Sequence, residues 1–163
     1  MAEPLQRFIQ LLRHPVKFRM FLLYKLPSAY FAGVRLKTIT PGYCEVTVPY
    51  KWFSQNPFRS TYFACLSMAA EMSTGALAMA HTYKIKPAVS MLVTRVEGDF
   101  IKKAVDVTTF LCEDGEQFQE VIRQAIETGE GHTFRARSTG RNKAGELVAE
   151  FFITWSFKAR RSK

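Results

Sequence analysis

A long uncharged segment in the first half of the chain constrains the fold most. Over residues 60–83 the only charged residue is Glu71, and small or apolar side chains make up most of the remainder. At 1.5 Å per residue, a helix over this segment extends about 35 Å. Because such a helix is apolar nearly all round, other parts of the chain must cover it on nearly every side. The sequence therefore predicts a buried central helix, with the hydroxyl of Ser60 or Thr61 as its N-cap.

Alternation of apolar and polar residues predicts strands on both sides of this helix. Two strands, at 34–38 and 44–50, flank a turn at Pro41-Gly42. The elements expected after the central helix are strands at 89–96 and 105–111, a short amphipathic helix at 116–128, and strands at 132–141 and 147–157. A mostly antiparallel sheet wrapped around one long central helix satisfies this order, so we expect an α+β fold.

The N-terminal segment has the pattern of an amphipathic helix over residues 3–26, which Pro15 divides or kinks. Two interpretations are open: the helix lies on a membrane surface, or it packs against its own domain or a partner subunit. We favour packing. The apolar face consists of Leu5, Phe8, Ile9, Leu12 and Val16. The expected organisation is an amphipathic helical segment at 1–29, one domain at 30–158 and a basic tail at 159–163.

Composition and charge exclude several classes of protein. With 163 residues, 47% of them hydrophobic, the chain is suited to one folded domain. Its net charge is +9, of which residues 1–37 carry +6 and residues 158–163 carry +4, so the body between them is nearly neutral. Basic ends favour solubility or attraction to anionic lipid or phosphate-bearing ligands. A nucleic-acid partner is not expected, because its charge would lie on the body.

Membrane spans and metal or disulfide sites are not expected either. The longest stretch without a charged residue has 12 residues, Met72 to Tyr83. This is shorter than the roughly 18 that suggest a transmembrane helix. Three cysteines without CxxC spacing predict no disulfide framework and no zinc site, which favours a reducing cytoplasm. The three histidines lie too far apart in the sequence to suggest a metal cluster.

Glu71 is the most informative residue for chemistry. A carboxylate in a buried helix costs several kcal/mol unless it is paired, hydrogen-bonded or neutral. Burial raises the pKa of a carboxyl group toward the range that suits a general base or acid. Two interpretations stay open: Glu71 is a catalytic residue, or it faces a gap in the sheet or pairs with an arginine.

The segment Ser60-Thr61-Tyr62-Phe63-Ala64, with Asn56 before it and Glu71 after it, resembles the hotdog-fold acyl-CoA thioesterases. The similarity is strongest to the phenylacetate-type branch, in a less-characterised group with Tyr-Phe-Ala at the helix start. It covers roughly residues 30–158 and implies a hotdog domain there. It also implies an acyl-CoA or other acyl thioester as substrate, and a homodimer or homotetramer in which two subunits share each site.

The resemblance assigns roles to individual residues. Glu71 would be the general base or nucleophile, with Asn56 and Ser90 assisting. Tyr62, Phe63 and Ala64 stand where the family often has His-Gly-Gly, and backbone N–H groups at this helix start would polarise the thioester carbonyl. The basic candidates for holding coenzyme A phosphates are Lys102, Lys103, Arg135 and Arg137. Coenzyme A enters only as part of the substrate, and no separate cofactor is expected.

Two functions from different classes remain. The first is hydrolysis of a fatty or aromatic acyl thioester in fatty acid metabolism. The second is a non-catalytic acyl-CoA or fatty-acyl binding protein in peripheral contact with a membrane surface. Tyr62-Phe63 and the basic N-terminus favour the second, whereas Glu71 with Asn56 favours the first.

Overall fold

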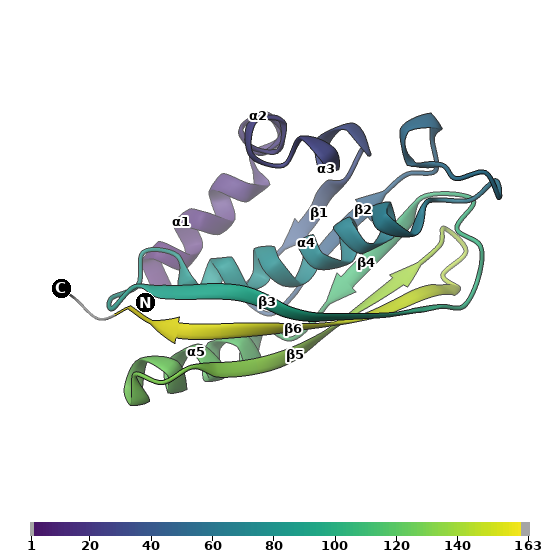
Figure 1. Cartoon of the computed structure of the whole chain (residues 1–163). Helices are drawn as coiled ribbons and strands as arrows, with labels where there is room; N and C mark the ends of the chain where they lie inside the picture. The colour runs from purple at the N-terminus through teal and green to yellow at the C-terminus, as the bar shows by residue number, and fades with distance from the viewer. Residues whose placement is uncertain (1, 161–163) are drawn as a thin grey trace.

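A computed structural model describes residues 2–160 of the chain and has an α+β fold (Figure 1). Of the predicted basic tail, residues 161–163 lie outside the described residues. The elements in chain order are α1 (Ala2–Arg13), α2 (Pro15–Lys25), α3 (Pro27–Phe31), β1 (Arg35–Ile39), β2 (Cys44–Val48), η1 (Trp52–Ser54), α4 (Phe63–Thr82), β3 (Val89–Phe100), β4 (Thr108–Cys112), α5 (Gly115–Thr128), β5 (His132–Arg141) and β6 (Leu147–Ala159).

The six strands form one sheet in the order β1-β2-β4-β5-β6-β3, and every neighbouring pair is antiparallel. β3 is therefore an edge strand, although it is third in the chain. It pairs with β6 from Val89↔Ala159 to Phe100↔Ala149, so it is longer than the predicted strand at 89–96. Alternation alone misses this extension because exposed residues follow one another along much of the edge.

The prediction of a central helix is confirmed, and the sheet curves around α4 (Figure 1). By length and composition α4 could cross a membrane, but 67% of its most apolar window is buried inside the fold. Its predicted N-cap is wrong: Tyr62 occupies that position and makes no side-chain capping bond. The hydroxyls of Ser60 and Thr61 bond elsewhere, to Asn56 Oδ1 and to the carbonyl of Ala104, each at 3.2 Å.

Two buried hydrogen bonds fix the rotation of α4 against the sheet. The hydroxyls of Ser73 and Ser138 on β5 lie 2.8 Å apart. Trp155 Nε1 on β6 donates to Thr74 Oγ1 at 3.0 Å. Since successive residues of a helix are about 100° apart, anchoring two of them to the sheet also fixes the direction of Glu71.

The N-terminal segment packs against the rest of the chain, as the favoured interpretation expects. Pro15 begins α2 after His14, so the predicted division is confirmed. Phe8 of α1 is buried, and its ring stacks on Tyr83 just beyond α4, with 4.6 Å between ring centroids. The apolar residues Val16 and Tyr24 of α2 remain 63% and 74% exposed.

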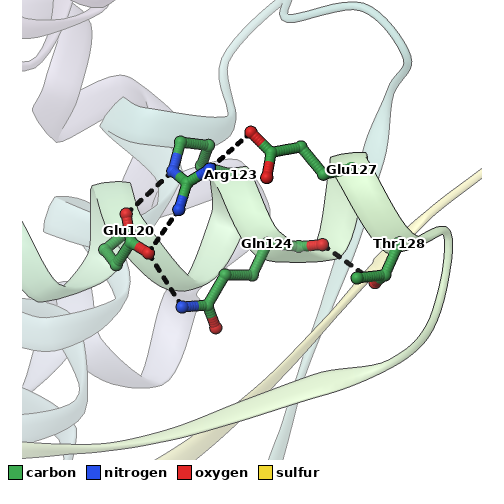
Figure 2. Close-up of polar contacts among 5 residues, drawn as sticks. All are labelled: Glu120, Arg123, Gln124, Glu127 and Thr128. Carbon is green, nitrogen blue, oxygen red and sulfur yellow. Dashed lines mark hydrogen bonds and ion pairs between the residues drawn. The ribbon is translucent and has the colours of Figure 1, made fainter.

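α5 is the predicted amphipathic helix, and its outer face carries a polar network (Figure 2). Arg123 contacts the carboxylates of Glu120 and Glu127, at 2.6 and 2.5 Å. Gln124 Nε2 donates to Glu120 Oε1 at 2.8 Å. The inner face packs Phe118 against Phe134 of β5 and Phe157 of β6. α5 therefore covers the sheet beside α4.

Candidate active site

Glu71 lies two turns into α4 with its carboxylate only partly exposed. A Cβ placed on Gly75 would come within 3.0 Å of Glu71 Oε1 and 3.1 Å of Trp155 Cζ2, so the carboxylate and the indole both lie against Gly75. Among residues 2–160 the Glu71 side chain has neither a hydrogen-bond partner nor an ion-pair partner. The predicted alternative of an arginine partner is therefore wrong within this range. Burial raises the pKa of Glu71.

Glu71 borders an apolar cavity of about 530 Å³. Lys17 is the other charged residue in its lining, and Thr82 the other polar one. The volume is in the range of small-molecule sites, which are mostly apolar with a few polar groups. The apolar lining is Phe8, Leu11, Leu12, Phe18, Phe21, Leu22, Leu26, Met72, Gly75, Ala76, Met79, Met91 and Trp155.

Asn56 and Ser90, the two predicted assistants, do not line this cavity. The Asn56 side-chain oxygen accepts bonds from the N–H groups of Phe58 and Ser60, at 3.0 and 3.2 Å, and so holds its own loop. Ser90 Oγ donates to the carbonyl of Lys158 on the neighbouring strand at 3.1 Å. One chain therefore does not bring the predicted catalytic set together around Glu71.

The start of α4 exposes both aromatic side chains and backbone donors. Tyr62 and Phe63 are 44% and 55% exposed and pack edge-to-face with each other. The N–H groups of Phe63 and Ala64 have no intrahelical acceptor, because they belong to the first turn. Phe63 and Glu71 are eight residues apart, which is about 12 Å along the helix.

The predicted phosphate-binding residues are exposed, and three of the four are ion-paired. Lys102 contacts Glu146 at 2.5 Å, Arg135 contacts Glu97 at 2.9 Å, and Arg137 pairs with Glu150. Lys103 Nζ instead donates to a backbone carbonyl at 3.3 Å. These cations are spread over the outer surface and do not border the cavity.

The walls of the cavity were not foreseen from the sequence. Half of the lining comes from residues 8–26, for which the sequence predicts a separate helical segment. One residue in the sequence could have indicated the cavity, namely Gly75, one turn after Glu71. Glycine in a helix interior costs about 1 kcal/mol relative to alanine, so its presence there indicates a position that needs space. No group of three or more His, Cys, Asp or Glu residues suited to a metal ion occurs in the part of the chain that the structure describes.

A family model described as a domain of unknown function, DUF4442, matches residues 16–157. The chain belongs to the DUF4442 family. The match covers α4, β1 to β5, most of β6 and nearly all of α2, and it leaves out α1. A search of curated protein sequences gives no match for this DUF4442 chain.

Solved structures share the fold of this DUF4442 chain. A protein of unknown function from Pseudomonas aeruginosa, named as a probable thioesterase, is 20% identical with a TM-score of 0.76, over 90% of this chain and 97% of that one. A thioesterase from Haemophilus influenzae is 11% identical with a TM-score of 0.65, over 89% and 90%. These similarities confirm the hotdog fold that the residues around Glu71 predict.

Proposed function

We propose that this protein hydrolyses acyl thioesters, with Glu71 as the catalytic carboxylate. The observation that carries the proposal is an unpaired, partly buried carboxylate bordering an apolar cavity in a hotdog fold. Similar structures from Pseudomonas aeruginosa and Haemophilus influenzae bear the name thioesterase, which supports the same chemistry. Acyl-CoA is the proposed substrate, with coenzyme A present only as its leaving group.

Glu71 can act in either of two ways. As a general base it takes a proton from water while the water oxygen attacks the thioester carbonyl carbon. As a nucleophile its carboxylate attacks that carbon, giving an anhydride that water then opens. In both routes the carbonyl oxygen becomes an oxyanion, the C–S bond breaks, and the thiolate leaves with a proton from solvent. A raised pKa makes the carboxylate a stronger base once it is ionised.

A two-subunit site follows from the length of α4. The oxyanion donors and the carboxylate must both lie about 3 Å from the reacting group. The N–H groups of Phe63 and Ala64 are about 12 Å along the helix from Glu71 of the same chain, so they serve a different site. A homodimer would bring the helix start of one subunit to Glu71 of the other, together with Asn56 and Ser90.

The edge strand β3 is the proposed dimer contact. Along its 12 residues, the backbone N–H and C=O groups that point away from β6 pair with no other strand among residues 2–160. Leu92, Val96 and Phe100 on it are 67%, 51% and 53% exposed. Pairing with a second β3 would satisfy the backbone and cover these side chains. A homotetramer would add a second contact elsewhere.

A non-catalytic acyl-binding protein is the second candidate. It is favoured by the hydrogen bonds that hold Asn56 Oδ1 in its own loop and by the bulky Tyr62 and Phe63 at the helix start. The exposed apolar residues of α2 would suit peripheral contact with a membrane. In either case we propose a cytoplasmic location, since all three cysteines are buried free thiols.

The test is release of free thiol from a panel of acyl-CoA substrates by wild type and Glu71→Ala. Glu130→Ala, at an exposed position beyond α5, is the matched control. Thiol release that falls about 100-fold or more in Glu71→Ala and is unchanged in the control supports the hydrolase. Equal rates in wild type and Glu71→Ala would contradict the assigned role. A folded wild type that binds acyl-CoA without turnover would establish the second candidate.

A further inference from the structure

The first two helices form one wall of the cavity beside Glu71. Of its 16 lining residues, eight come from residues 8–26, and six come from α4. Met91 of β3 and Trp155 of β6 provide the remaining two. The cavity therefore lies between the N-terminal helices and the central helix, with the sheet along one side.

The cavity is elongated along α4. Its lining residues on that helix run from Glu71 to Thr82 on a single face, at spacings of three and four residues. Eleven residues of helix correspond to about 16 Å. At the far end Phe8, which also lines the cavity, stacks on Tyr83 with 4.6 Å between ring centroids. The space therefore has its carboxylate near one end and the ring of Phe8 near the other.

These dimensions define the shape of an occupant. An extended chain advances about 1.2 Å per bond, taken from the 3.6 Å that a peptide chain covers in three bonds. About 16 Å then corresponds to roughly 13 bonds. An acetyl or phenylacetyl group with its carbonyl at Glu71 would leave most of this length empty, and unfilled apolar space forfeits packing contacts.

The rim of the cavity is apolar as well. Leu11, Phe21 and Met79 line it and are 44%, 42% and 40% exposed. An alkyl chain lying along these residues removes their apolar surface from water, which favours binding. A polar acyl group gains little here, since among the described residues that line the cavity only Thr82 and Lys17 are polar besides Glu71.

We infer that this cavity binds a linear aliphatic acyl chain of roughly a dozen carbons, and that side chains of α4 along the cavity set the accepted length. The inference rests on the proposed function, because it places the thioester carbonyl at Glu71 and the chain end near Thr82. Ala76 lies about midway between these points, and its small side chain leaves the passage open. Ala76 and Met79 are therefore the residues that determine chain length.

Two cavity-filling variants test the inference. Ala76→Leu narrows the middle of the cavity, and Met79→Trp fills space farther from Glu71 at a position that tolerates bulk because it is 40% exposed. Met20→Trp is the control, since Met20 is 44% exposed on α2 and does not line the cavity. Thiol release is measured from butanoyl-CoA through hexadecanoyl-CoA. Binding of dodecanoic and tetradecanoic acids is measured separately by calorimetry, with Glu71→Gln included.

Wild type is expected to prefer dodecanoyl- and tetradecanoyl-CoA. Ala76→Leu should reduce kcat/KM for these chains about tenfold or more and leave butanoyl-CoA within about twofold. The effect of Met79→Trp should begin at longer chains than that of Ala76→Leu, and Met20→Trp should retain the wild-type profile. A flat profile, a preference for short or aromatic acyl groups, or equal losses at every length in folded Ala76→Leu and Met79→Trp would overturn the inference.

Fatty-acid binding separates this inference from the proposed function. Binding of dodecanoic acid that Ala76→Leu weakens, in a protein without thiol release, would support the chain pocket and contradict hydrolysis. Glu71-dependent hydrolysis with no effect of Ala76→Leu or Met79→Trp would support hydrolysis and overturn the pocket. A protein that shows neither Glu71-dependent thiol release nor binding of dodecanoic acid would contradict both the proposed function and the chain pocket.

Discussion

Replacing Glu71 with glutamine should stabilise the protein at neutral and alkaline pH. Burial raises the pKa of this carboxyl group, so the folded state binds its proton more tightly than the unfolded state does. At pH values between 4.5, the ordinary pKa, and the raised pKa of the folded state, the unfolded state binds fewer protons than the folded state does. Stability from this group is therefore full at low pH and falls as pH rises through that interval. The neutral amide of Glu71→Gln would mimic the protonated acid at every pH.

The size of the gain follows from the linkage. Each unit by which burial raises the pKa corresponds to about 1.4 kcal/mol lost once Glu71 is ionised. For a chain of this length, about 1 kcal/mol corresponds to roughly 2–4 °C in Tm. Because Glu71 is only partly buried, solvent screens its charge. The gain in the free energy of unfolding should therefore be smaller than this conversion gives for a fully buried carboxyl group.

The assay is thermal unfolding of wild type and Glu71→Gln at about pH 5 and about pH 8, followed by circular dichroism. The Tm difference should be small at the lower pH and a few degrees in favour of the variant at the higher pH. Glu130→Gln should show no such pH-dependent gain because Glu130 is exposed. A gain that is equal at both pH values, or a less stable variant at the higher pH, would refute the reasoning.

Three further variants test contacts elsewhere in the structure. Gly115→Ala should lower the free energy of unfolding in urea by about 2 kcal/mol or more, because the added Cβ would lie 2.1 Å from the carbonyl oxygen of Pro41. An unchanged free energy of unfolding would contradict this packing. Trp155→Phe should cost about 2 kcal/mol in the same assay, since it removes the buried bond to Thr74 and part of the ring, and a neutral effect would show that the bond is not made. Arg135→Ala with Arg137→Ala should change KM for acyl-CoA less than about twofold, because both guanidinium groups already pair with carboxylates; a tenfold rise would instead assign them to coenzyme A.

The fold could be predicted because its strongest signal is local. A long uncharged helix with a single acid needs cover on nearly every side, and strands on both sides of it provide that cover. The predicted N-cap was wrong because the candidate hydroxyls bond to groups outside the helix. Ser60 and Thr61 have the right side chains, but one bonds to Asn56 and the other to Ala104, 43 residues away. The bond to Ala104 is a tertiary contact that leaves no mark in the local sequence, whereas the bond to Asn56 is local and depends on the conformation of the loop.

The site was predictable only in part. Glu71 could be singled out because it is the one charged residue in an apolar helix. The wall that α1 and α2 form could not be predicted, because Phe18 and Leu22 have the same sequence pattern whether they cover a cavity or a solid core. The arginines on β5 were candidates for phosphate binding until the sheet register placed Arg137 opposite Phe152, with Glu150 within reach. Pairing across strands is decided by topology rather than by neighbours in the sequence.

The pH dependence of thioester hydrolysis tests the central claim most directly. If ionised Glu71 carries out the reaction, kcat/KM for dodecanoyl-CoA must rise with pH along an acid limb whose midpoint lies above 4.5, since burial raises the pKa of the free protein. The remaining activity of Glu71→Gln must lack that limb. An acid limb that is the same in wild type and Glu71→Gln would contradict the account.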